Sequence, residues 1–172
     1  MRKELFQPTF ETEARLLLLI NAFSSPVKSL DGRTKLTKLD FFLRYPGYLK
    51  RGLEIRNPDI QIEVRDEEVI NIEAKMIRYR YGPWDPSYFA VLGRLIGKGL
   101  IQIIPSSRGI GYRTTEEGKQ LSKKISSDEN WQEVALRIKL LKRHFDLSGS
   151  SLMKFIYEHF PEVAGASWGD KL

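Results

Sequence analysis

A chain of 172 residues is long enough to bury one hydrophobic core, so we expect one domain with extensions. The absence of cysteine excludes disulfides, thiolate zinc sites and a cysteine nucleophile. The 28 basic and 22 acidic residues leave a net charge of +6, which permits contact with nucleic acid or an acidic partner. The apolar run at residues 16–20 is too short to span a bilayer and residues 1–10 carry no signal pattern, so we expect a soluble, cytoplasmic protein.

The first part of the chain predicts three helices. A helix over about residues 10–23, with Thr9 as its N-cap, is apolar nearly all round and belongs at the centre of the core. A second helix begins after Thr34 and stops before Pro46, because the residue that precedes a proline avoids helical angles. Pro46 can open a short third helix, and residues 60–72 then indicate short strands or an irregular insertion.

The next part of the chain predicts the back half of a winged helix-turn-helix. A two-stranded wing covers the apolar stripe of a helix only when other helices pack behind it, and the first two helices supply that backing. We expect a short strand over 78–81 and then a helix from the N-cap Asp85 to a stop at Gly99. A buried strand over 100–104, a turn over 105–109 and a strand over 110–114 should follow. The next helix should begin at a capping box formed by Thr114 and Glu117.

The expected fold class is therefore mainly α, within α+β: a winged helix-turn-helix with a two-stranded wing, an insertion between helices and additional C-terminal helices. The winged-helix domain covers residues 1–127, with the insertion at about 46–82. A helical extension follows over 128–163. The glycine-rich tail over 164–172 is expected to fray, although Trp168 could anchor it.

No convincing catalytic or metal-binding pattern is present. His144 and His159 lack partners at metal-ligand spacing. Asp59 after a proline, followed by Glu73 and Lys75, has the form of a metal-dependent nuclease signature, but it uses common residues at loose spacing and requires a central sheet. We expect a non-enzyme without cofactor, membrane contact or small-molecule substrate, and keep the nuclease as a less favoured alternative.

Basic residues near the wing are candidates for non-specific contact with double-stranded DNA. The expected helix before the wing exposes few groups able to read base edges, which favours an ordinary solvated face or a protein contact instead. The DNA-contact candidates are Lys35, Lys38, Arg78, Arg80, Arg94, Lys98, Arg108 and Arg113.

Aromatic residues in the expected loop before that helix favour a partner surface, because Trp and Tyr are enriched among interface anchors. The alternative is that this loop packs on its own core. The partner-contact candidates, which include basic residues of the C-terminal helices and the tail tryptophan, are Tyr81, Trp84, Tyr88, Arg137, Lys142 and Trp168.

Four stretches of the sequence carry a family resemblance: residues 36–46 (LTKLDFFLRYP), residues 79–86, residues 92–101 (LGRLIGKGLI) and the wing exit YRTTEEG at 112–118. They resemble the middle components of ABC-three-component systems, in particular the small winged-helix subunit of Lamassu-type anti-phage and anti-plasmid systems. The resemblance implies a non-catalytic accessory subunit that bridges an SMC-like ATPase and an effector, often a nuclease. It transfers no catalytic residue. A stand-alone winged-helix transcriptional regulator, usually a symmetric dimer, is the alternative.

Overall fold

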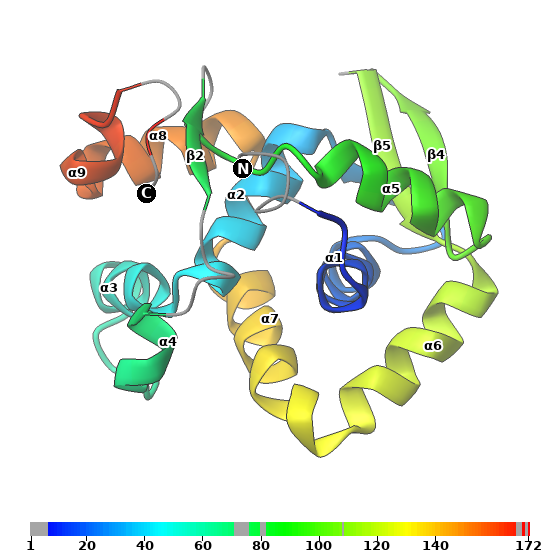
Figure 1. Ribbon diagram of the computed structural model, residues 1–172, viewed down its shortest axis with the longest axis horizontal. Coiled ribbons are helices and arrows are strands. Elements are labelled where there is room, and N and C mark those ends of the chain that lie inside the picture. Colours follow the sequence, from blue (N-terminus) through cyan, green and yellow to red (C-terminus); the bar gives the residue numbers. More distant parts are fainter. Residues whose placement is uncertain (1–6, 71–75, 80–81, 108, 168–169, 171) are drawn as a thin grey trace.

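The computed structural model describes residues 7–70, 76–79, 82–107, 109–167, 170 and 172 (Figure 1). The described chain is mostly helical, with one three-stranded and one two-stranded antiparallel sheet, so the protein is α+β. Within this part, no helix combines the length and the apolar composition that crossing a bilayer requires. The elements are α1 (Phe10–Phe23), β1 (Leu30–Asp31), α2 (Arg33–Arg44), α3 (Pro46–Arg56), α4 (Asp66–Ile70), β2 (Ile77–Tyr79), β3 (Gly82–Trp84), α5 (Tyr88–Gly97), β4 (Ile101–Ser106), β5 (Gly109–Thr114), α6 (Glu116–Ser127), the 3-10 turn η3 (Glu129–Trp131), α7 (Gln132–His144), α8 (Gly149–His159) and α9 (Pro161–Ala164).

The first three helices have nearly the predicted limits. Thr9 caps α1, and its hydroxyl oxygen accepts a hydrogen bond from the backbone N–H of Thr12 at 3.1 Å. α2 begins at Arg33, two residues earlier than predicted, and ends before Tyr45. α3 begins at Pro46 as predicted. These limits follow from capping and proline chemistry, which act within one helical turn.

The start of α5 differs from the prediction, whereas its end is confirmed. Asp85 caps a turn rather than the helix: its carboxylate accepts from the N–H of Ser87 at 2.7 Å, and α5 begins at Tyr88. Gly99 has φ +70°, and the following N–H of Leu100 reaches the carbonyl of Leu95 at 3.0 Å. Glycine adopts this left-handed angle without the steric cost of a Cβ, so the helix stops there.

The predicted capping box of α6 is wrong by one residue. Thr115 is the N-cap, and its hydroxyl oxygen accepts from the N–H of Gly118 at 3.0 Å. Thr114 is instead buried at the end of β5, where its hydroxyl lies 3.2 Å from the amide oxygen of Asn21 in α1. Pairing with β4 holds Thr114 in the strand, because it lies directly opposite Ile101.

The predicted hairpin is present, but it belongs to a sheet of three strands in the order β1-β5-β4. The short strand β1 pairs Leu30 with Tyr112, and the sequence did not predict it. Gly111 permits this close approach, since a Cβ there would lie 2.2 Å from the hydroxyl oxygen of Ser29. The prediction of a buried strand over 100–104 is wrong beyond Ile101, because the helices cover only the first residue of β4.

The first part of the region for which the sequence predicted short strands or an irregular insertion is an irregular loop. Residues 57–65 form no strand, and Ile60 and Ile62 pack against the core from a loop. The short helix α4 follows, so the alternative of short strands is wrong for the described residues before β2. β2 confirms part of the strand predicted over 78–81, and it pairs with β3, which the sequence did not predict.

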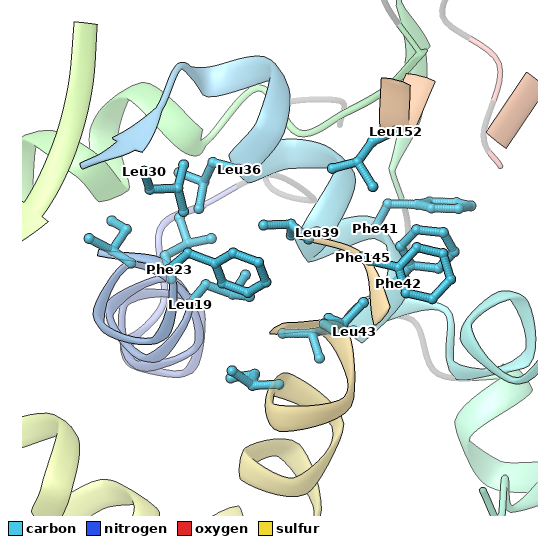
Figure 2. Close-up of a cluster of buried hydrophobic side chains, with 14 of the residues drawn as sticks. Leu19, Phe23, Leu30, Leu36, Leu39, Phe41, Phe42, Leu43, Phe145 and Leu152 are labelled. Atoms are coloured by element: carbon cyan, nitrogen blue, oxygen red, sulfur yellow. The ribbon is translucent and has the colours of Figure 1, made fainter. Parts of the chain in front are cut away.

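The core lies around α1, which Figure 1 shows end-on between α2, α5, α6 and α7. The helices after residue 128 share this core: Figure 2 shows Phe145 beside Phe42, with ring centroids 4.9 Å apart. Leu152 of α8 and Leu39 of α2 are also fully buried in the same hydrophobic cluster. The C-terminal helices therefore complete the core instead of being appended to it.

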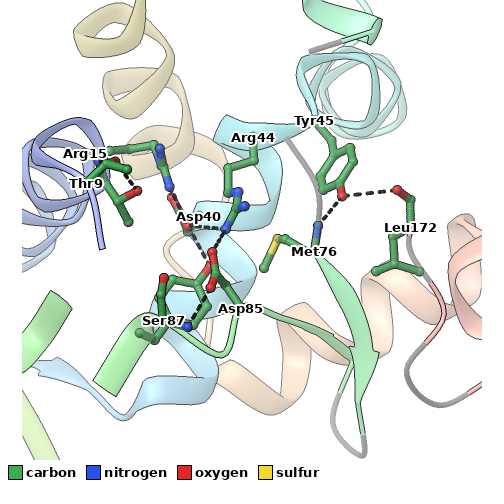
Figure 3. Close-up of polar contacts among 11 residues, drawn as sticks. Thr9, Arg15, Asp40, Arg44, Tyr45, Met76, Asp85, Ser87 and Leu172 are labelled. Carbon is green, nitrogen blue, oxygen red and sulfur yellow. Dashed lines mark hydrogen bonds and ion pairs between the residues drawn. The ribbon is translucent and has the colours of Figure 1, made fainter. Parts of the chain in front are cut away.

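The last residue of the chain is held in place. The N–H of Leu172 donates to the carbonyl of Met76 at 3.0 Å, and the hydroxyl of Tyr45 donates to the carbonyl of Leu172 at 3.2 Å (Figure 3). The prediction of a frayed tail is therefore wrong at Leu172. Trp168, the proposed anchor, lies outside the described residues.

Candidate interaction surface

A buried polar network joins α1, α2 and the start of α5, and sequence reasoning did not predict it. The guanidinium of Arg15 donates to Asp40, with Nε 2.5 Å from Oδ1 and Nη2 3.3 Å from Oδ2 (Figure 3). The hydroxyl of Tyr88 donates to Asp40 Oδ2 at 2.6 Å. Arg44 lies between Asp40 and Asp85, with Nη1 2.5 Å from Oδ2 of Asp85. A hint was present in the sequence, since Arg15 and Asp40 interrupt apolar runs.

The network keeps Asp40 charged and Tyr88 protonated. Burial alone would raise the pKa of Asp40, but the guanidinium of Arg15, helped by Arg44, outweighs it and lowers that pKa. Burial and the neighbouring carboxylate of Asp40 raise the pKa of Tyr88 well above 10. Neither group is placed to exchange protons at neutral pH, so the network stabilises the packing of three helices.

The predicted aromatic partner surface is rearranged. Tyr88 is 1% exposed, so the expectation of an exposed ring there is wrong: its hydroxyl bonds to Asp40 inside the core. Trp84 is half-buried, with its ring 5.3 Å from that of Tyr88 and 5.7 Å from that of Phe89. Phe89 is exposed instead, and sequence reasoning missed it although it lies off the apolar stripe of α5. Tyr81 lies outside the described residues.

Three of the predicted basic contact residues are buried, which corrects their assignment to an open face. Lys35 lies beneath the α7–α8 loop, with Nζ 2.5 Å from Oδ1 of Asp146. Lys38 is 2% exposed. Arg137 is 4% exposed and holds Glu68 of α4 at 2.7 Å. Helical spacing placed these residues off one apolar stripe, but α2 and α7 are covered on more than one side.

The remaining basic candidates on α5 are engaged by one acidic residue of α1. Arg94 lies 3.4 Å from a carboxylate oxygen of Glu13, and Lys98 makes an ion pair with the other oxygen. Arg113 of β5 donates to the carbonyl of Pro26 at 2.6 Å. Because α1 places a carboxylate beside both cations of α5, the field that this helix presents to solvent is weak.

The other predicted contact residues lie on α7, in β2 or outside the described part of the chain. Lys142 of α7 pairs with Asp146 at 2.7 Å. Arg78 lies in β2, but its side chain is not among the described ones. Arg80 and Arg108 lie outside the described residues, so their predicted contact with DNA stays a prediction.

The outward face of α5 is instead apolar and small. At Gly93 and Gly97 an added Cβ would meet nothing within 4 Å, so this face is open. Two exposed isoleucines of the adjoining hairpin, Ile103 and Ile110, add apolar area. We call the exposed apolar and small residues of α5 the α5 surface: Phe89, Ala90, Gly93, Ile96 and Gly97.

The described part of the chain contains only one charged residue of the nuclease signature, Asp59, so the nuclease alternative stays untested. Asp59 is exposed in a turn, where its backbone N–H donates to the side chain of Asn57 at 3.2 Å. Glu73 and Lys75 lie outside the described residues. Within the described ranges, no group of three or more His, Cys, Asp or Glu side chains could hold a metal ion. His159 packs its ring 4.5 Å from that of Phe155.

Comparison of the chain with protein-family models, with curated proteins and with solved structures returns no match. The α5 surface presents exposed apolar area beside two cations, Arg94 and Lys98, that Glu13 already engages.

Proposed function

We propose that this chain is a non-catalytic, cytoplasmic, winged-helix accessory subunit that docks on partner proteins through the α5 surface. The order helix, strand, helix, helix and hairpin supports the winged-helix interpretation, with α3 to β3 inserted between the second and third of its helices. By the family resemblance, the partners are an SMC-like ATPase and an effector, and contact with DNA is secondary.

The observation that carries the proposal is the chemistry of α5, which occupies the position of a recognition helix. Reading base edges needs hydrogen-bonding side chains, whereas the α5 surface offers Phe89, Ile96 and small residues. The two basic residues beside this surface, Arg94 of α5 and Lys98 at the end of the helix, already have a carboxylate partner in Glu13. A face of small residues beside an aromatic one fits the close approach of another protein surface.

The test uses a steric block. The chain is co-expressed with an SMC-like ATPase and an effector encoded beside it, and assembly is measured by pull-down. Gly93→Leu adds a bulky side chain to the α5 surface, where nothing lies within 4 Å, so it leaves the fold intact but blocks docking. We expect assembly to weaken by tenfold or more, roughly the cost of losing one interface anchor.

Gly47→Leu is the matched control. Gly47 lies in α3, also with nothing within 4 Å of an added Cβ, so the same substitution there leaves assembly unchanged. Equal assembly of both variants with the ATPase would remove the α5 surface from the interface. Failure of the unaltered chain to bind either partner would overturn the accessory role.

DNA binding separates this role from that of a stand-alone regulator. We expect the isolated chain to bind DNA weakly and non-specifically, at about 10⁻⁴–10⁻⁶ M, with an affinity that falls as salt is added. Tight binding to one sequence, far above a scrambled duplex, would favour the regulator. Fluorescence anisotropy with labelled duplexes at two salt concentrations makes the measurement.

A further inference from the structure

A cavity of about 300 Å³ lies between the start of α2, the strand β3 and the start of α5. It is separate from the buried network around Asp40 and touches the α5 surface only at Phe89. Its volume is at the lower end of the range for small-molecule sites. The side chains that give it chemical character are Arg33, Thr34, Thr37, Lys38, Trp84 and Phe89.

The α2 side of the cavity carries two positive charges. Lys38 is buried, with Nζ 3.4 Å from the hydroxyl of Thr37. Gly82 makes room for this ammonium group, since a Cβ there would lie 3.2 Å from Nζ. No acidic residue is among the described residues that line the cavity. A fixed cation next to an open cavity of this kind favours an anionic occupant.

Arg33 is the second cation. In the part of the chain that the structure describes, its guanidinium makes no ion pair and no hydrogen bond, and it stacks over the ring of Phe89 at 4.7 Å. The hydroxyl of Thr34, one residue further on, likewise has no hydrogen-bond partner among the described residues. Five guanidinium N–H groups and a hydroxyl therefore remain available to a ligand with several acceptor oxygens.

The opposite side of the cavity is aromatic. The rings of Trp84 and Phe89 lie 5.7 Å apart at 59° to each other. The ring of the buried Tyr88 contacts the ring of Trp84 edge to face, with 5.3 Å between the ring centroids. A flat heterocycle can pack against such rings, and stacking of a base on an aromatic side chain contributes about 1–3 kcal/mol.

We propose that this cavity binds a mononucleotide, with the phosphate held by Arg33, Thr34 and Lys38 and the base packed against Trp84 and Phe89. A phosphate is attracted by the two cations and offers more acceptor atoms than a carboxylate does. The sequence predicted no small-molecule partner, because these residues come from three separate segments. The proposal is independent of the partner role of the α5 surface.

The experiment measures binding of adenosine 5′-monophosphate, with adenosine and inorganic phosphate as separate arms. Replacing Trp131 and Trp168 by Phe leaves Trp84 as the reporter among the three tryptophans. Fluorescence titration then reports the cavity directly. Isothermal titration calorimetry on the unaltered chain gives the same constants without any substitution, so the test does not depend on the folding of the reporter variant.

We expect the mononucleotide to quench the fluorescence of Trp84 in a saturable way. Adenosine should bind about tenfold or more weakly than the mononucleotide, and inorganic phosphate should compete with the mononucleotide for the cavity. Arg33→Ala and Thr34→Val should each weaken binding of the mononucleotide and leave binding of adenosine unchanged. Arg143→Ala is the matched control, because Arg143 is an exposed arginine on α7 away from the cavity. Thermal melting confirms that each variant is folded.

Three results would overturn the proposal. Equal affinities for adenosine and its monophosphate would show that no phosphate is recognised. Equal losses in Arg33→Ala and Arg143→Ala would assign the binding to net charge. Absence of saturation with the mononucleotide would remove the cavity as a nucleotide site.

Discussion

Tyr88 at the start of α5 donates a hydrogen bond to Asp40 in the middle of α2, with 2.6 Å between the two oxygen atoms. The residues are 48 positions apart, and both are buried. Arg15 of α1 bonds to the same carboxylate at 2.5 Å. One charged group thus joins α1, α2 and α5, and its carboxylate keeps the hydrogen bonds from Arg15 and Tyr88 only while all three helices are in place.

Substitutions in this network should destabilise the fold unequally. Asp40→Asn leaves the guanidinium of Arg15 buried beside a neutral amide, and we expect it to cost about 3–5 kcal/mol of unfolding free energy. Tyr88→Phe removes one hydrogen bond to a charged acceptor and should cost about 1–3 kcal/mol. Urea denaturation measures both. A larger loss in Tyr88→Phe than in Asp40→Asn would contradict the assignment of Asp40 as the centre of the network.

Acid should weaken the fold through Asp146. Burial alone would raise the pKa of this carboxyl, but hydrogen bonds from Lys142 and Lys35, with further help from Lys28, hold the pKa well below 3.8. The unfolded chain therefore takes up this proton first, at about pH 4. The stabilisation is complete above about pH 5 and is lost as pH falls through the pKa of the folded state.

Asp146→Asn tests this pH dependence. At pH 7 the variant should be less stable by roughly 1–2 kcal/mol, and the difference from the unaltered chain should shrink as pH falls below about 4. Urea midpoints at several pH values give the comparison. Asp59→Asn, at an exposed turn, is the control. A difference that grows towards acid would contradict the sign of the pKa shift.

Gly118 should tolerate no side chain. A Cβ there would lie 2.0 Å from the carbonyl oxygen of Leu100, so Gly118→Ala must push α6 away from the start of β4. We expect a loss of about 1–3 kcal/mol or more. Gly93→Ala is the control in an open helical position and should instead stabilise by about 0.5–1 kcal/mol. Thermal melting of both variants measures the change in stability. An unchanged stability of Gly118→Ala would contradict the close packing of α6 against Leu100.

Arg137 should act in stability rather than in partner contact. Its guanidinium bonds to Glu68 of α4 at 2.7 Å and to Glu133 of α7 at 2.5 Å. Arg137→Ala should therefore cost about 2–3 kcal/mol and speed hydrogen–deuterium exchange over residues 57–70. Lys139→Ala, at an exposed position of the same helix, should change neither. Weakened partner binding with unchanged stability and exchange would restore the prediction made from the sequence.

Many element limits could be predicted because their causes are local. Thr9 caps α1, Pro46 opens α3 and Gly99 ends α5, each within one turn of the residue responsible. The hairpin between α5 and α6 was predictable for the same reason. The one-residue error at Thr115 shows the limit of such reasoning, since two adjacent threonines offer the same capping chemistry and pairing of Thr114 with β4 decides between them.

The sequence by itself determined the limits of α1 and α3, the end of α5 and the apolar stripe that each of these helices turns inwards. Only the tertiary structure decided which other faces are covered. Lys38 and Tyr88 are buried because β3 and α2 lie against them, and β1 forms because β5 offers an unpaired edge. Periodicity describes one helix at a time, whereas burial and charge pairing depend on segments distant in the chain, such as Glu13 beside Arg94 and Lys98.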